Sequence, residues 1–289
     1  MLACRIPPVG RMTLAPMLKH DGKVIGDFSL SRLDDETFLI IGSGIAENYH
    51  MRWFISQLPE GADIEVSSLG LGLTGLSIAG PNARDVLAAI TADDVSNDAF
   101  RFMDVREMEL GMVPAIVGRV SYTGDLGYEI WIAPEYQRIL FDRIMAEGEA
   151  HGIRLVGGRA LNALRLEKNF GSWAREYRPL YGPVECGLSR FVAYDKDADF
   201  IGRKAALTER EEGGTMRLRS FVVEAKDADV IGDEPVHFKG EVRGWVTSGG
   251  FAHASGKSVA MGYVPKEIAD EHDGWEIELL GETLKATLQ

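Results

Sequence analysis

The stretch Gly118-Arg-Val-Ser-Tyr-Thr-Gly-Asp-Leu-Gly-Tyr-Glu-Ile-Trp-Ile132 decides the fold, because two apolar runs flank a turn bracketed by glycines. This pattern predicts a β-hairpin with a loop of several residues. Side chains alternate along a strand, so Tyr128 and Ile130 are expected on one face. Glu129 and Trp131 are expected together on the other face.

The pairing of Glu129 with an aromatic neighbour allows two interpretations. A carboxylate beside an aromatic ring could form the floor of a pocket for a flat ring that donates hydrogen bonds. Alternatively, the segment is an ordinary half-buried strand with a solvated glutamate. The pattern alone favours the second interpretation, because exposed glutamates are common.

Composition limits the class of protein. The chain has 289 residues, 45% of them hydrophobic and 26% charged, which is enough for a normal buried core. The formal net charge of −13 argues against a nucleic-acid partner, since phosphate binding needs clustered Lys and Arg. We expect no membrane partner, because no apolar run approaches the length of a membrane span.

Cysteines and histidines provide no metal motif. The two cysteines, Cys4 and Cys186, form neither a disulfide framework nor a metal-binding spacing, and a reducing cytoplasm is the default expectation. The six histidines lack the spacings typical of metal ligands, so we expect no metal. Gly42-Ser-Gly44 follows a predicted strand and precedes a helix-like segment, but the third glycine and a suitably placed acid of a dinucleotide site are missing. Gly70–Gly75 is followed by a strand and not by a helix, so both segments are interpreted as turns.

The first part of the chain mixes strands and helices. Leu2-Ala3 and Pro7-Pro8 are interpreted as the tail of a lost helix, so we expect apolar surface to be exposed at this end of the chain. Asp27 lies inside a predicted strand, where an acid is disfavoured, so it is either on a wet face or in a site. Strands are predicted at residues 12–18, 24–30, 37–41, 76–78, 113–120, 127–132 and 191–194, and helices at about 80–90, 134–150, 158–169 and 202–210.

The last part of the chain contains only strand and turn signals. Glu211-Glu-Gly-Gly214 has the composition of a linker. Strands are predicted after it at residues 217–223, 236–238, 241–246, 258–264 and 275–280. We therefore predict an α+β fold: an α/β body of two interleaved subdomains over residues 1–213, followed by a C-terminal antiparallel β-barrel over residues 214–289.

A set of motifs in this order resembles the aminomethyltransferase (glycine-cleavage T-protein) superfamily. Each motif is weak alone, but the set is specific and covers nearly the whole chain. The quoted segments are Pro16–Asp27 ("ML…G…D"), Leu76–Arg84 ("GPxA"), Ser121–Glu129 ("YTGExGxE"), Asn162–Glu167, Gly187-Leu188, Phe200–Ala205, and Val246–Gly249 with Val259–Tyr263.

Within this superfamily, the chain looks most like the folate-binding C-terminal region of dimethylglycine and sarcosine dehydrogenases. Gly42-Ser-Gly44 with Arg52-Trp53, and Ala163–Lys168 followed by Trp173, are the details typical of that branch. The segment Leu180–Cys186 differs from the Lys-Gly-Cys-Tyr segment of iron–sulfur-assembly relatives, so that branch is set aside. The resemblance also implies that an N-terminal portion of the family fold is absent here.

The resemblance assigns roles to individual residues. Asp27 falls on the aspartate close to the reacting nitrogens of tetrahydrofolate and is the expected catalytic residue. Glu129 falls on the glutamate that recognises the pterin, whose edge offers an N–H and an NH₂ group that one carboxylate can accept. The remaining expected cofactor-binding positions are Tyr122, Phe100, Phe170, Trp173 and Ile41.

Two positions depart from the family pattern. Leu161 stands where the T-protein has an arginine that contacts folate, so that contact is lost or supplied elsewhere. Leu14 replaces a tyrosine of the pocket.

The function implied by the resemblance is tetrahydrofolate-dependent capture of a methylene unit from an amine such as dimethylglycine, sarcosine or a glycine-derived aminomethyl group. Two alternatives stay open: methyl transfer from a sulfonium or ammonium donor to tetrahydrofolate, and a folate-binding module without catalysis. The expected partners are folate, a small one-carbon donor, and either a flavin amine oxidase subunit or a second copy of the chain.

Overall fold

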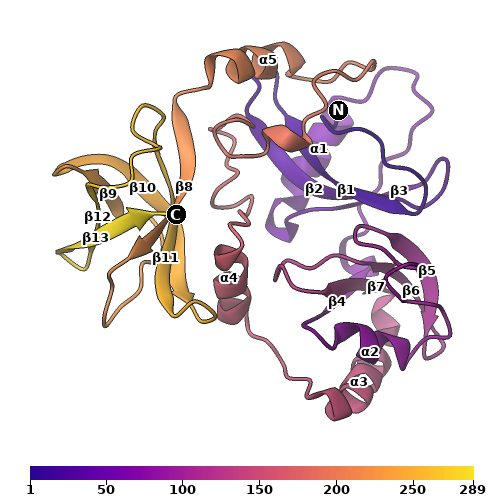
Figure 1. Ribbon diagram of the computed structural model, residues 1–289. Coiled ribbons are helices and arrows are strands. Elements are labelled where there is room, and N and C mark those ends of the chain that lie inside the picture. Colours follow the sequence, from indigo (N-terminus) through magenta and orange to yellow (C-terminus); the bar gives the residue numbers. More distant parts are fainter. The chain divides into compact units, whose positions relative to one another are not determined.

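The structure is a computed structural model that describes residues 1–289 (Figure 1). The chain divides into two compact units, each of which is discontinuous in sequence. We call them the barrel unit (Met1–Arg5, Ala15–Phe28 and Gly157–Gln289) and the sheet unit (Ile6–Leu14 and Ser29–Val156). The chain passes between the units four times, after residues 5, 14, 28 and 156.

The sheet unit contains a four-stranded antiparallel sheet in the order β4-β7-β6-β5. Its strands are β4 (Thr74–Ala79), β5 (Val105–Leu110), β6 (Val113–Gly118) and β7 (Gly127–Ile132). The predicted hairpin is confirmed, since β6 pairs with β7 and places Gly118 opposite Glu129. Strand β5 was not predicted; it carries three charged residues among its six, which masks the strand pattern.

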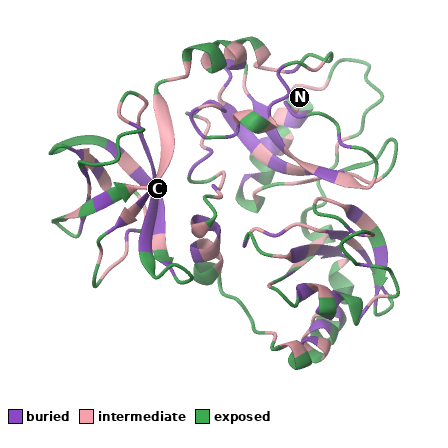
Figure 2. Cartoon of the chain, in the orientation of Figure 1, coloured by how far each residue is buried: buried purple, intermediate pink, exposed green.

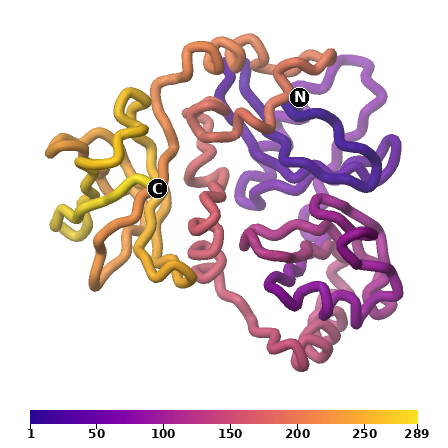
Figure 3. Tube along the Cα trace, viewed as in Figure 1, coloured from indigo at the N-terminus to yellow at the C-terminus, as the bar shows by residue number.

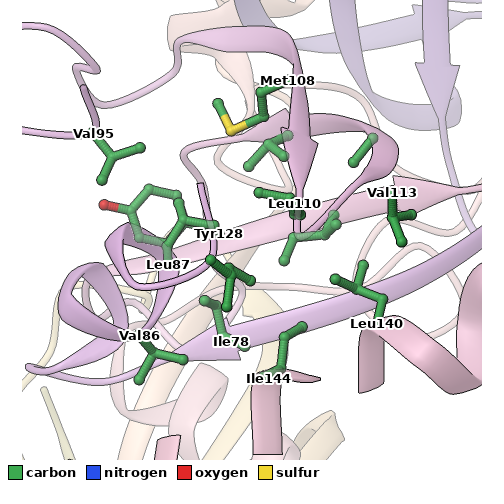
Figure 4. Close-up of a cluster of buried hydrophobic side chains, with 14 of the residues drawn as sticks. Ile78, Val86, Leu87, Val95, Met108, Leu110, Val113, Tyr128, Leu140 and Ile144 are labelled. Atoms are coloured by element: carbon green, nitrogen blue, oxygen red, sulfur yellow. The ribbon is translucent and has the colours of Figure 1, made fainter. Parts of the chain in front are cut away.

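One face of this sheet is covered by α2 (Ala83–Ala88) and α3 (Gln137–Gly148), the latter flanked by 3₁₀ turns at Pro134–Tyr136 and Glu149–His151. Figure 4 shows Leu87 and Leu140 from these helices gathered with Tyr128 in a single apolar cluster. Tyr128 and Ile130 are both fully buried there, whereas Trp131 belongs to a separate cluster with Met12. The predicted alternation along β7 is therefore confirmed.

A second sheet has three strands in the order β1-β2-β3: β1 (Arg11–Leu18), β2 (Val24–Arg32) and β3 (Phe38–Ile41). The division between the two units falls within β1 and within β2. The chain continues through η1 (Gly44–Ala46) and α1 (Glu47–Ser56) to η2 (Gly70–Gly72). Both glycine-rich segments thus form short turns, as predicted.

The C-terminal strands close into a six-stranded barrel in the order β10-β11-β8-β13-β12-β9, with every pairing antiparallel. They run over β8 (Met216–Val223), β9 (Pro235–Phe238), β10 (Glu241–Ala252), β11 (Lys257–Pro265), β12 (Trp275–Leu279) and β13 (Glu282–Leu288), coloured orange to yellow in Figure 3. Phe221 and Trp275 pack edge to face inside the barrel, with ring centroids 5.3 Å apart. The predicted barrel is confirmed, with β13 as an additional strand.

The barrel unit also holds α4 (Gly158–Glu167), η5 (Ser189–Phe191) and α5 (Arg203–Glu212). The strand predicted at residues 191–194 is wrong. Its backbone groups find separate partners, with Ala193 donating to Ala3 and Tyr194 accepting from Arg203, so no strand ladder forms. None of the helices combines the length and apolar composition that a membrane crossing requires.

The N-terminal segment differs from the predicted helix tail. It is extended: Leu2 bridges to Met17, and the backbone N–H of Ala3 donates to Pro16 at 2.8 Å. Ala3 is fully buried and Leu2 is partly buried. Figure 2 colours the chain by burial. Exposed apolar side chains, as expected for this end of the chain, are found a few residues further on. The exposed apolar side chains are Ile6 and Val9, with 68% and 48% of their surface accessible.

The barrel core predicts a large effect for Phe221→Ala. Phe221 is fully buried against Trp275, so removing its ring leaves a cavity and should lower the free energy of unfolding by about 3–5 kcal/mol. Phe251→Ala is the matched control, because that ring is 39% exposed on the same barrel and should change stability by about 0.5 kcal/mol or less. Urea unfolding measures both; equal losses would contradict the assignment of the barrel interior.

Candidate functional site

Asp27 lies on β2 within the barrel unit, partly buried between fully or nearly fully buried neighbours. The pKa of its carboxyl is raised to about 7, mainly because desolvation disfavours the charged form and in smaller part because of the Glu176 charge. A hydrogen bond from its own backbone N–H opposes this shift. Of the two interpretations of Asp27 from the sequence, desolvation of the carboxyl argues against an acid on a solvent-exposed face of the strand.

The loop that follows α4 brings a second predicted residue to the same strand. The indole N–H of Trp173 donates to the backbone oxygen of Ile25 at 2.8 Å, two residues before Asp27. Gly171 shapes this loop, because a Cβ there would lie 2.5 Å from the Tyr177 ring. Phe170, the third predicted residue of the barrel unit, is partly buried at the start of the loop.

Glu129 lies on β7 of the sheet unit and is partly buried. Burial raises the pKa of its carboxyl above its ordinary value, and its carboxylate makes no hydrogen bond or ion pair within the chain. Its cross-strand neighbours are Gly118, which has no side chain, and the exposed Ser77. The Glu129 carboxylate is therefore desolvated, and its two oxygens are available to accept hydrogen bonds. This differs from the solvated glutamate of the alternative interpretation.

The other predicted residues of the sheet unit have different environments. Tyr122 is partly buried in the β6–β7 turn, which is fixed by a 2.7 Å hydrogen bond between the hydroxyls of Ser121 and Thr123. Ile41 ends β3, partly buried against the cluster that contains Trp131.

Phe100 is fully buried in the core of the sheet unit. Its ring stacks on Tyr128 with centroids 5.8 Å apart, and the Arg106 guanidinium lies 4.9 Å from the ring centre. The ligand-binding roles assigned to these residues by the resemblance stay predictions.

The sequence analysis did not find the buried pair Arg165–Glu176 in the barrel unit. Arg165 lies on α4, one turn from Asn162, and its Nη1 atom is 3.2 Å from Glu176 Oε2. The position of an arginine near an asparagine on one helix was visible in the sequence, but Glu176 lies in a loop among other charged residues. Nothing in the local pattern distinguishes it from a solvated glutamate.

The departure at Leu161 is not compensated by Arg165. Leu161 is partly buried at the first turns of α4, and the guanidinium of Arg165 is already occupied by Glu176, Ser248 and the Phe170 carbonyl. An anionic ligand group would therefore need a different cation.

The predicted residues of each unit, considered separately, have a chemistry that fits part of a folate-type ligand. Asp27 and Glu129 are desolvated carboxylates, neither of which has a cationic partner, and such groups accept hydrogen bonds from a polarised N–H edge. Trp173, Tyr122 and Phe170 are aromatic and only partly buried, which suits contact with a flat ring.

Comparisons with known proteins agree with this chemistry. The model of the GCVT N-terminal domain matches residues 1–196, and the model of the glycine cleavage T-protein C-terminal barrel domain matches residues 217–289. Mitochondrial dimethylglycine dehydrogenase of Mus musculus is 37% identical over 284 residues, which cover 98% of this chain and 33% of that protein. The chain thus spans about a third of the length of this relative.

An aminomethyltransferase of Desulfitobacterium hafniense (strain Y51) is 27% identical over 275 residues, covering 95% of this chain and 74% of that protein. The crystal structure of glycine cleavage system aminomethyltransferase T from Bartonella henselae has the same fold, with a TM-score of 0.87 and 24% identity over 98% of this chain and 76% of that one. Aminomethyltransferases of this family bind tetrahydrofolate. The chain belongs to the glycine cleavage T-protein family.

Proposed function

We propose that the chain binds tetrahydrofolate and captures a one-carbon unit from an amine, with dimethylglycine, sarcosine or a glycine-derived aminomethyl group as the source. Family membership supports one-carbon transfer at the level of the reaction class. The observation that carries the proposal for this chain is Asp27, a carboxyl group with a pKa of about 7 on a strand of the barrel unit.

The residues proposed to hold the pterin are those with unused hydrogen-bonding capacity or accessible aromatic surface. Glu129 would accept the two adjacent donors of the pterin edge with its two oxygens. Trp173, Phe170, Tyr122 and Ile41 would provide apolar contact. Phe100, which is fully buried, would support this surface from within the core.

Asp27 would perform the proton transfer. Tetrahydrofolate, when bound, supplies the nitrogen atoms that accept the one-carbon unit. An Asp27 carboxylate oxygen would take up the proton that is released and return it to solvent. A group with a pKa of about 7 is suited to this role, because both of its protonation states are populated at neutral pH.

The origin of the one-carbon unit is also a proposal. The dimethylglycine dehydrogenase relative is about three times as long as this chain, since the match covers 33% of it. We propose that a flavin amine oxidase, as a further domain or a separate subunit, oxidises the amine and delivers the one-carbon unit. Light scattering of the chain with and without such an oxidase tests this, and also tests the alternative of self-association.

Single-turnover assays with candidate donors decide among the three functions. Formation of methylene-tetrahydrofolate from an oxidised amine or formaldehyde supports the proposal. Methyl transfer from a sulfonium or ammonium compound would support the methyltransferase alternative. Binding of tetrahydrofolate without turnover of any donor would support the binding module.

Glu129→Gln should weaken tetrahydrofolate binding. An amide offers one acceptor in place of two, and the cost should be roughly 1–3 kcal/mol for a buried contact. The dissociation constant would therefore rise about 5- to 150-fold in isothermal titration calorimetry. Glu107→Gln is the matched control, since Glu107 is exposed on β5 of the same sheet and should leave the affinity unchanged. Unchanged affinity in Glu129→Gln would remove this residue from the site.

Asp27→Asn should lower the single-turnover rate by roughly 10²–10⁴-fold with near-normal folate binding, because an amide cannot accept the proton. In the native chain the rate should rise with pH through about 7, as Asp27 ionises, and then level off. A rate that is independent of pH in this range, or an Asn variant with native turnover, would assign Asp27 to a structural role.

The same variant gives a measurement that does not depend on activity. The folded-state pKa of Asp27 lies above its value of about 4 in the unfolded chain, so folding favours the protonated form. This contribution to stability is fully present below pH 4 and is lost as the pH rises through about 7. The difference in urea-unfolding free energy between the native chain and Asp27→Asn should therefore change between pH 4 and 7, whereas Asp35→Asn at a highly exposed site should show no such trend.

A further inference from the structure

The barrel unit contains a fully buried ion pair whose two charged groups have several further hydrogen-bond partners. The side chains of Arg165 and Glu176 are 4% and 0% exposed. The guanidinium also donates to Asn162 Oδ1 at 3.0 Å, to Ser248 Oγ at 2.6 Å and to the Phe170 carbonyl at 2.9 Å. A buried ion pair gains stability only with such additional hydrogen bonds, since desolvation of the two charges is costly.

Glu176 connects this pair to the barrel. Its Oε1 atom accepts hydrogen bonds from Thr247 at 2.7 Å and from Ser248 at 2.5 Å, both on β10. The hydroxyl of Tyr263 on β11 donates to the Glu176 backbone oxygen at 2.7 Å. Two adjacent barrel strands therefore hold this one residue through its side chain and its backbone.

Glu176 also shapes the loop that reaches the strand of Asp27. Its Oε2 atom accepts the backbone N–H of Ser172 at 2.8 Å, which closes the turn that presents Trp173. Trp173 in turn donates to Ile25 on β2. A continuous series of hydrogen bonds thus runs from β10 through Glu176 and the loop to the backbone beside Asp27.

The charge of Glu176 also affects the pKa of Asp27. Desolvation is the main cause of the raised pKa of Asp27, and Glu176 is the charged group that adds to it. Cys186 is the other titratable group coupled to Asp27, and the pKa of its buried thiol is raised in part by the Asp27 charge. No basic group is among the causes of the shift in the Asp27 pKa.

We propose that Glu176 is a positioning residue for Asp27, which fixes the loop against β2 and places a second negative charge near the Asp27 carboxyl. The inference rests on the proposed function, in which Asp27 carries the proton. The alternative is a purely structural ion pair that stabilises the barrel. The two differ in one respect: only the positioning role requires that Asp27 respond when the Glu176 charge is removed.

The experiment is an NMR pH titration of the ligand-free chain labelled with ¹³C at the aspartate carboxyl carbons. The Asp27 signal, assigned by its loss in Asp27→Asn, should titrate near pH 7, apart from carboxyls with ordinary pKa values. In Glu176→Gln its midpoint should move to lower pH. The indole N–H signal of Trp173, assigned with Trp173→Phe, should also shift, because the turn loses its anionic acceptor.

Glu185→Gln is the matched control. Glu185 is another buried carboxylate of the barrel unit, bound to Lys23 at 2.9 Å and to the Gly182 and Thr215 backbone, and it does not act on Asp27. Removing the Glu185 charge tests whether the loss of any buried carboxylate changes the Asp27 and Trp173 signals. Both the Asp27 titration midpoint and the Trp173 indole signal should stay at their native positions.

A second variant keeps the test decisive if Glu176→Gln does not fold. The double variant Arg165→Met with Glu176→Leu removes both charges, and hydrophobic residues of similar volume often replace a buried ion pair without loss of stability. The double variant should also lower the pH midpoint of the Asp27 titration. A folded variant without the Glu176 charge whose Asp27 midpoint equals the native one would overturn the inference. Failure of the proposed function appears separately, as absence of tetrahydrofolate binding in calorimetry.

Discussion

The structure of the barrel unit depends on the compensation of one buried charge by another. Arg165 and Glu176 are both removed from water, and each oxygen of the carboxylate has a donor. Helix α4, strands β10 and β11 and the loop at residues 171–177 all supply groups to this pair. Since an unpaired charge at this depth would be strongly unfavourable, these four segments have to come together in one arrangement.

The buried carboxyl groups of this chain have different roles because their surroundings differ. Glu185 is buried, yet Lys23 and several backbone N–H groups bind it and hold its pKa at about 2, so it is a permanent anion that ties loops together. Asp27 and Glu129 experience the same desolvation without a cation, and their pKa values move upward. The first kind of site stabilises the fold, and the second retains capacity for chemistry or for a ligand.

Sequence patterns predicted those parts of the fold that local periodicity determines. The β6–β7 hairpin, the main helices and the barrel have strong apolar repeats, and all were predicted. Strands β5 and β13 were missed because their residues are largely polar or charged, and they are strands only because neighbouring strands pair with them. The segment at residues 191–194 is the opposite case: its apolar residues suggest a strand, but tertiary partners take its backbone groups one at a time.

The candidate site shows the same limit. Asp27 stands out in the sequence because an acid is unusual inside a strand, whereas the pattern around Glu129 favoured an ordinary solvated glutamate, and the resemblance gave each a role. Glu176 could not be found in this way, since its importance comes from Thr247 and Ser248, more than seventy residues further along the chain. Burial and charge compensation of this kind are properties of the folded chain, and no local pattern encodes them.

The repeated passage of the chain between the two units has an evolutionary consequence. Each unit is assembled from separate segments, with boundaries after residues 5, 14, 28 and 156. A single recombination event between residues 6 and 156 would therefore transfer fragments of both units and a complete copy of neither. An exchange between genes that keeps both units intact would have to transfer the alternating segments of both units together. The two units are therefore expected to be inherited as a pair.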